Sequence, residues 1–251
     1  MSKKSLLFIT EGKVDEPDFI KKFLEVCIPN VEYNIYSYST TIHTLAKTIF
    51  NRKGKIDKDL DIKRVLREQE KDITKREVLS NDYTDVVLVF DFEPRCDSPE
   101  FDKVEKMIEY FNDSSNRGRL YINYTMMQSY KHFKRFPDEE FKDRKIETID
   151  VTNYKEIVHK ESQYKKLVDY NYPICLNIIG YHLMKANYII SNRYSLMDRD
   201  EFFSLDYKKI YNIERENNEK YGYVDVLNTF ALFIIEFNPT DMIEKIKKFI
   251  L

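Results

Sequence analysis

Glycine is scarce in this chain: only five occur among 251 residues, and tryptophan is absent. With aromatic residues at 14% of the sequence, this scarcity predicts long helices and few flexible loops. Cysteine is rare as well. Cys27, Cys96 and Cys175 are widely spaced and odd in number, which argues against a disulfide framework or a zinc knuckle and indicates reduced thiols in a cytosol.

Long apolar runs are also absent. The longest, Phe230 to Ile235, is far too short to span a bilayer. The basic start is followed only by the short run Leu6 to Ile9, which does not read as a signal peptide. We therefore predict a cytoplasmic protein with no membrane partner. The motif G-x-x-x-x-G-K-[ST] is missing too, so any ATP that is needed must be bound by another protein.

No excess of positive charge covers the chain, whose formal net charge is −2. Any nucleic-acid binding must therefore come from a local basic face. The histidines show no metal-ligand spacing, which favours structural or exposed roles over zinc binding. The cysteines lack a nearby basic pattern that would mark a nucleophile. The histidines in question are His43, His132, His159 and His182.

The composition, with 42% hydrophobic and 33% charged residues, fits a globular protein that is long enough to bury a core. In the first half, short apolar or β-branched segments alternate with helical patterns. This order predicts an α/β domain over residues 1–125, with a largely parallel sheet flanked by helices. The predicted strands span residues 5–10, 31–39, 85–90 and 119–124, and the predicted helices span residues 17–27, 41–50 and 98–111.

The second half lacks a convincing strand, and we predict a mainly helical subdomain over residues 126–251. Its predicted helices span residues 172–190, 201–222, 223–237 and 239–251.

A charged helical excursion is predicted within the first domain, over residues 51–80. Its charges have mixed signs, which is typical of a solvated helical surface. It could instead reach nucleic acid or a partner protein through Arg52, Lys53, Lys55, Lys63, Arg64 and Arg67.

Acidic residues follow two of the predicted strands. Glu11 comes directly after the first strand, and Asp91 and Glu93 follow the strand that ends at Phe90. Ligands of a parallel sheet bind at the carboxyl ends of its strands. An extended backbone would point Asp91 and Glu93 the same way. Three converging carboxylates repel one another unless a divalent cation neutralises them, and hard oxygen ligands suit Mg²⁺ or Mn²⁺.

Acids at strand ends are also common in ordinary loops, and that interpretation stays open. The order of features along the chain is more specific than acids at strand ends alone. An apolar strand is followed by Glu11-Gly12, a helix, and a later strand that ends in Asp-x-Glu. This order resembles the TOPRIM domain, which has a glutamate after its first strand and Asp-x-Asp after a later one. The stretch "TEGKVDEPDFIKKF" looks most like the RloB/OLD-like nucleases. Glu93 departs from the usual aspartate, and Pro94 follows it.

The resemblance covers about the first 125 residues. It implies Mg²⁺-dependent hydrolysis of phosphodiester bonds in DNA or RNA, including tRNA. Glu11 would act as a ligand or general base, and Asp91 and Glu93 would hold the metal. Members of this group serve in bacterial anti-phage defence, sometimes beside an ATPase partner.

Further candidates surround these acids. Gly12 would let the backbone turn tightly beside a metal and a bound phosphate, and we group Lys13 with it as a nucleic-acid contact. Asp15 and Glu16 lie in the first helical turn, where they either favour the helix dipole or serve a second metal.

The stretch Tyr121 to Phe136 follows the last predicted strand, and Lys131 is the preferred basic catalytic candidate within it. An ordinary amphipathic helix start with exposed basic residues remains an open interpretation. Tyr130 or Phe133 would stack on bases. The polar side chains that would contact phosphate are those of Ser129, Lys131, His132, Lys134 and Arg135.

Two other function classes compete with a nuclease. One is a non-catalytic interaction or sensor module with a degenerate acidic cluster that works with a partner ATPase. The other is a phosphatase-like or phosphoryl-transfer enzyme that uses the same acids.

Overall fold

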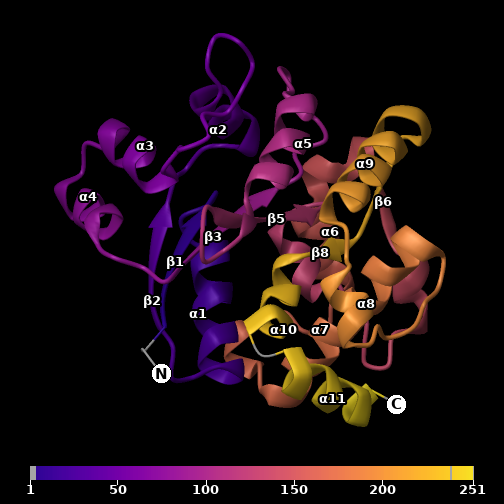
Figure 1. The fold of residues 1–251 in the computed structure, drawn as a ribbon. Helices are drawn as coiled ribbons and strands as arrows, with labels where there is room; N and C mark the ends of the chain where they lie inside the picture. The colour runs from indigo at the N-terminus through magenta and orange to yellow at the C-terminus, as the bar shows by residue number, and fades with distance from the viewer. Residues whose placement is uncertain (1–3, 238, 251) are drawn as a thin grey trace. The chain divides into compact units, whose positions relative to one another are not determined.

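The computed structural model describes residues 4–237 and 239–250. The chain divides into two compact units, and each is made of several separate segments. The first unit holds the chain up to Pro17, then Asn30–Asp91 and Cys96–Tyr121. The second unit holds Asp18–Pro29, Phe92–Arg95 and the chain from Ile122 onward. Figure 1 follows the path of the chain through both.

The first unit contains a sheet with the strand order β2-β1-β3-β5-β4. β1 runs parallel to both of its neighbours, so that Thr10 pairs with Ser37 on one side and Val89 on the other. The apolar side chains of β1 and those of Val87 to Phe90 in β3 are fully buried, as expected for strands covered on both faces. The strands are β1 (Ser5–Thr10), β2 (Glu32–Ser37), β3 (Asp85–Asp91), β4 (Asn112–Asp113) and β5 (Gly118–Tyr124).

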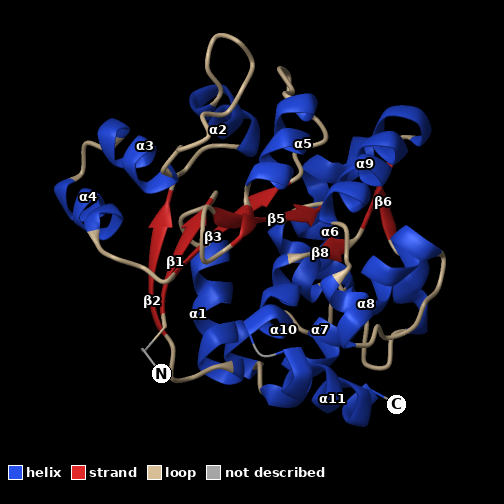
Figure 2. Cartoon of the chain, in the orientation of Figure 1, coloured by secondary structure: helices blue, strands red, loops and turns tan. Residues whose placement is uncertain are grey.

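The predicted α/β class is therefore confirmed, with a mostly parallel mixed sheet flanked by helices (Figure 2). In the first unit the helices are α2 (Ile42–Ile49), α3 (Ile62–Gln69), α4 (Ile73–Ser80) and α5 (Phe101–Tyr110). The charged excursion folds as α3 and α4, which pack against each other. α1 (Asp15–Cys27) begins in the first unit and continues in the second.

The predicted start of α5 at Ser98 and Pro99 is wrong by two to three residues. The helix begins at Phe101, and its N-cap, Glu100, makes no side-chain capping bond. A tertiary contact explains the delay: the backbone N–H of Glu100 donates to Nδ1 of His43, at 3.1 Å. Sequence patterns near the helix end carry no sign of that bond.

The second unit contains the long helix α7 (Tyr172–Ser191), which packs against α11 (Pro239–Ile250) and α9 (Tyr207–Glu216). Asn171 caps its first turn and Pro173 follows, in the arrangement that favours a helix start. The other α-helices are α6 (Tyr154–Glu161), α8 (Arg199–Phe203), α9 (Tyr207–Glu216), α10 (Phe233–Phe237) and α11 (Pro239–Ile250). The last residue of the predicted final helix, Leu251, lies outside the described residues.

Shorter helical turns complete this unit. They are the 3₁₀ turns η1 (Met127–Lys131), η2 (Glu139–Asp143), η3 (Thr148–Asn153), η4 (Leu167–Asp169) and η6 (Phe230–Leu232), and the π-turn η5 (Asn217–Tyr221).

Three predictions for the second half are wrong: it does contain strands, and neither residues 201–222 nor residues 223–237 form one helix. The chain leaves the helical conformation between the end of α8 at Phe203 and the start of α9 at Tyr207, where Asp206 caps α9. β6 (Lys145–Glu147) pairs antiparallel with β7 (Tyr223–Asp225), and β8 (Leu227–Asn228) pairs with β5. Val224 and Val226 are fully buried while Tyr223 and Asp225 are half-buried. This is the alternation of a strand, which the apolar content of the whole segment concealed.

No helix in the described part of the chain is long and apolar enough to cross a membrane.

Candidate metal centre at the carboxyl ends of β1 and β3

Glu11 and Asp91 lie side by side at one edge of the sheet. The backbone N–H of Glu11 donates to the carbonyl of Val89, at 3.2 Å. In return, Oε2 of Glu11 accepts the backbone N–H of Asp91, at 3.3 Å. Because β1 and β3 are parallel neighbours, their carboxyl ends meet here. The sequence predicted this juxtaposition, and the structure places both acids in the same unit, with Asp91 buried and Glu11 half-buried.

Glu16 belongs to the same corner of the first unit. It lies in the first turn of α1 and is only 6% exposed. A Cβ atom built on Gly12 would lie 2.1 Å from Oε2 of Glu16. Only glycine therefore fits at position 12 while that carboxylate keeps its place. Gly12 itself is half-buried, and Lys13 and Asp15 are exposed.

The end of β2 also reaches Glu11, which the sequence did not suggest. Ser39 has a left-handed backbone, with φ of 66°, and its N–H donates to the carbonyl of Glu11 at 3.0 Å. The hydroxyl of Thr10 donates to the carbonyl of Gly12, at 2.9 Å, and contacts the hydroxyl of Ser37. The predicted strand 31–39 contains both serines. If that strand is taken as the parallel neighbour of the first strand, its carboxyl end is expected to lie beside Glu11.

Glu93 does not continue the strand. β3 ends at Asp91, and Glu93 has a left-handed backbone with φ of 53°. Asparagine, aspartate and glycine adopt this conformation more readily than glutamate. The expectation that an extended backbone aligns Asp91 and Glu93 is therefore wrong at Glu93. By its contacts Glu93 belongs to the second unit.

The basic candidates after β5 all lie in the second unit. Lys131 ends the short turn η1, and its ammonium lies over the ring of Tyr130, 5.6 Å from the centroid. Lys134 is exposed and pairs with Glu140, and this partner raises its pKa. Arg135 is exposed.

Ser129 is fully buried, and its hydroxyl oxygen accepts the side-chain amide of Asn228 at 3.3 Å. A phosphate contact at Ser129 would have to break that bond.

The two aromatic rings proposed for base stacking lie in the interior of the second unit. Tyr130 stacks on Phe19, with ring centroids 3.8 Å apart, and Phe133 stacks on Phe141 at 4.2 Å. Neither ring is exposed to a base. His132 is buried between Tyr154 and Glu161, which it contacts at 3.1 and 3.0 Å, and burial lowers its pKa.

The donor chemistry at the strand ends fits a hard divalent cation. Mg²⁺ is usually held by one or two carboxylates and keeps several waters, and Glu11 and Asp91 supply two. Among residues 4–237 and 239–250, no group of three or more His, Cys, Asp or Glu side chains is placed to hold a metal ion. Comparisons of the chain with protein-family models, with curated proteins and with solved structures return no match.

Proposed function

We propose that the chain is a Mg²⁺-dependent TOPRIM-type nuclease that hydrolyses phosphodiester bonds in DNA or RNA, including tRNA, as an effector of bacterial anti-phage defence. The observation that carries this proposal is the contact between Glu11 and Asp91 at the carboxyl ends of two parallel strands. A divalent cation binds where carboxylates gather at a sheet edge, and it assists the hydrolysis of a phosphodiester.

Each residue has a definite part in the proposal. Glu11 and Asp91 hold the cation. When bound, the cation activates water and stabilises the charge that develops on the leaving oxygen. The alternative role for Glu11, which is half-buried rather than enclosed, is that of the general base. Lys13 is exposed, so its ammonium can meet the charge of a phosphate.

The test is cleavage of plasmid, single-stranded DNA and total RNA with Mg²⁺ or Mn²⁺ by wild type, Glu11→Gln and Asp91→Asn. Both substitutions keep the shape of the side chain, and glutamine still offers an oxygen to the Asp91 N–H. We expect wild type to cleave at least one substrate. Each variant should lose at least about a hundredfold of that activity, as expected for the loss of a metal ligand.

Glu77→Gln and Asp82→Asn are the matched controls, because both acids are exposed in the same unit. They should cleave like wild type. Equal cleavage by wild type and the two site variants would remove the catalytic assignment. If wild type cleaves no substrate, calorimetric titration with Mn²⁺ tests the metal site directly. Absence of Mn²⁺ binding by wild type would rule out the proposed site.

The second candidate is a non-catalytic interaction or sensor module that works with a partner ATPase. The left-handed backbone at Glu93 favours it, because that residue leaves the line of β3. Metal binding by wild type without cleavage of any nucleic acid would support this candidate. Turnover of a small phosphate ester that depends on Asp91 would instead favour phosphatase chemistry with the same acids.

A further inference from the structure

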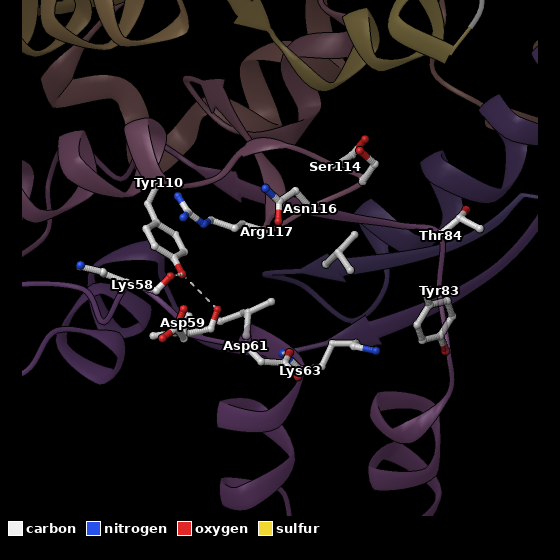
Figure 3. A pocket seen from close by; sticks show the side chains of 14 residues that line it. Lys58, Asp59, Asp61, Lys63, Tyr83, Thr84, Tyr110, Ser114, Asn116 and Arg117 are labelled. Atoms are coloured by element: carbon white, nitrogen blue, oxygen red, sulfur yellow. Dashed lines mark hydrogen bonds between the residues drawn. The ribbon is translucent and has the colours of Figure 1, made fainter.

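A pocket of about 400 Å³ lies at the opposite end of β3 from the acidic pair. Thr84 and Val86 line it at the start of the strand, whereas Asp91 ends the strand. Seven extended residues span about 20 Å, so the two sites are separate. Figure 3 shows the pocket with Asn116 and Arg117 on one side and Asp59 and Asp61 on the other. All of these residues belong to the first unit.

One wall is the segment between α2 and α3. The hydroxyl of Tyr110 donates to the carbonyls of Lys58 and Leu60, at 3.1 Å each. Asp61 then caps α3 by accepting the backbone N–H groups of Lys63 and Arg64. Hydrogen bonds therefore tie this wall to Tyr110 and to the start of α3, although it is a loop.

The other wall is the turn between β4 and β5. Asp113 accepts the backbone N–H and the hydroxyl of Ser115, and the hydroxyl of Ser114 donates to the buried Asp85 at 2.8 Å. Gly118 ends the turn with φ of 107°, and a Cβ atom there would lie 2.9 Å from Leu88. Because of these contacts, the turn presents Asn116 and Arg117 toward the pocket in a fixed place.

Tyr110 joins the two walls. Its hydroxyl holds the first one, and its ring lies under the guanidinium of Arg117, 4.8 Å from ring centroid to Cζ. Tyr83 stands at the far side of the pocket, with the ammonium of Lys63 5.5 Å from its ring centroid. The pocket thus offers flat aromatic surfaces beside apolar side chains at Leu60, Ile62 and Val86.

The charges of the lining favour an anion. The lining carries three basic side chains, Lys58, Lys63 and Arg117, and two acidic ones, Asp59 and Asp61. The carboxylate of Asp61 already accepts backbone N–H groups at the amino end of α3. In the described part of the chain, the side chains of Lys58 and Arg117 form no hydrogen bond or ion pair. An arginine with free donors matches the geometry of a phosphate. A zwitterion such as an amino acid would leave one of these cations unmatched.

We propose that this pocket binds a nucleoside monophosphate. Arg117 and Lys58 receive the phosphate, Asp59 accepts the ribose hydroxyls, and Asn116 bonds the edge of a base that lies against Tyr83. The volume suits a ligand of this size. The site is independent of the proposed nuclease chemistry, because it needs neither Glu11, Asp91 nor a metal.

Isothermal titration calorimetry in EDTA tests the proposal, with the four ribonucleoside monophosphates, adenosine and inorganic phosphate as probes. We expect at least one monophosphate to bind about tenfold more tightly than adenosine or phosphate, because each fragment keeps only half of the contacts. Arg117→Ala should weaken binding by about tenfold or more. Arg117 is exposed, so this variant is expected to fold, and its thermal transition checks that.

Arg76→Ala is the matched control, since Arg76 is an exposed arginine of the same unit outside the pocket. It should bind like wild type, and so should Glu11→Gln. The proposal is overturned if no monophosphate binds wild type, or if Arg117→Ala and Lys58→Ala both bind as tightly as wild type. Phosphate that binds as tightly as the nucleotides would overturn the assignment of the base and ribose contacts.

Discussion

At the scale of single residues, the second unit buries a cluster of charged side chains that no sequence motif predicts. Lys185 is fully buried, forms an ion pair with Asp225 at 2.5 Å and donates to the carbonyls of Lys142 and Arg144. Glu214 is also fully buried, and its Oε2 accepts the backbone N–H of Asp225 at 2.9 Å. Burial, and then the nearby Asp225 carboxylate, raise the pKa of Glu214 well above its ordinary value.

This cluster predicts that stability falls as pH rises. Folded Glu214 keeps its proton at pH values where the unfolded side chain has lost it, so unfolding releases a proton. The stabilisation is complete below the unfolded pKa and is lost as pH rises toward the folded pKa. Glu214→Gln mimics the protonated acid. The free energy of unfolding of each protein is measured in urea from pH 4 to 9. The difference between the variant and wild type should therefore shift in favour of the variant as pH rises.

Glu216→Gln, on the exposed side of the same helix, is the control and should follow the pH profile of wild type. Parallel profiles for wild type and Glu214→Gln would show that Glu214 is ionised when folded.

The residue scale also separates what could be predicted from what could not. Glu11 and Asp91 were predictable because each directly follows an apolar run, and parallel strands bring their carboxyl ends together. Glu214 and Lys185 were not, because a charged residue within a helix usually faces solvent. Their burial depends on partners from η2, from Arg144 and from β7, and no local pattern records those partners.

At the scale of elements, a helix start can be predicted from the sequence when the residues that fix it lie next to it in the chain. α7 begins where the sequence predicts, because its start depends on Asn171 and Pro173 in the chain itself. α5 begins later than predicted because His43, distant in the sequence, holds Glu100 outside the helix. The prediction of one helix over residues 223–237 is wrong for another reason. The strand residues, in which buried and half-buried side chains alternate, are few, and a longer apolar run follows them.

The cap of α7 gives the prediction at this scale. Oδ1 of Asn171 accepts the backbone N–H of Ile174, at 3.1 Å. Asn171→Ala should lower the free energy of unfolding by about 1 kcal/mol, the usual value of such a cap. Urea denaturation monitored by circular dichroism measures it. Asn30→Ala changes an exposed asparagine in the turn between α1 and β2 and should cost less than about 0.5 kcal/mol. Equal losses would show that the cap contributes nothing specific.

At the scale of the whole molecule, the compact units do not follow the chain in two blocks. The sequence predicted a boundary between residues 125 and 126, whereas the second unit also takes residues 18–29 and 92–95. Within that unit, Phe19 of α1 stacks on Tyr130 and contacts Phe230 edge-on. Composition changes along a chain reveal consecutive domains, but not segments that return to an earlier one.

A fragment of residues 126–251 is therefore predicted not to fold by itself. It lacks the ring of Phe19, and it lacks Ile122, whose carbonyl accepts the hydroxyl of Thr229 at 2.8 Å. We expect no cooperative thermal transition in near-ultraviolet circular dichroism, in contrast to the full chain. A sharp transition of the fragment would show that the second half is an autonomous domain.

The close approach of Gly12 and Glu16 has a consequence for how such a sequence can change over time. No side chain fits at position 12 while the carboxylate of Glu16 occupies the space beside it. Because that carboxylate is the far end of a flexible side chain, a larger residue at position 12 is accommodated when the Glu16 carboxylate moves aside. Selection at position 12 therefore acts on where the carboxylate of Glu16 lies, and a change of residue there is felt first as a displaced negative charge beside the end of β1.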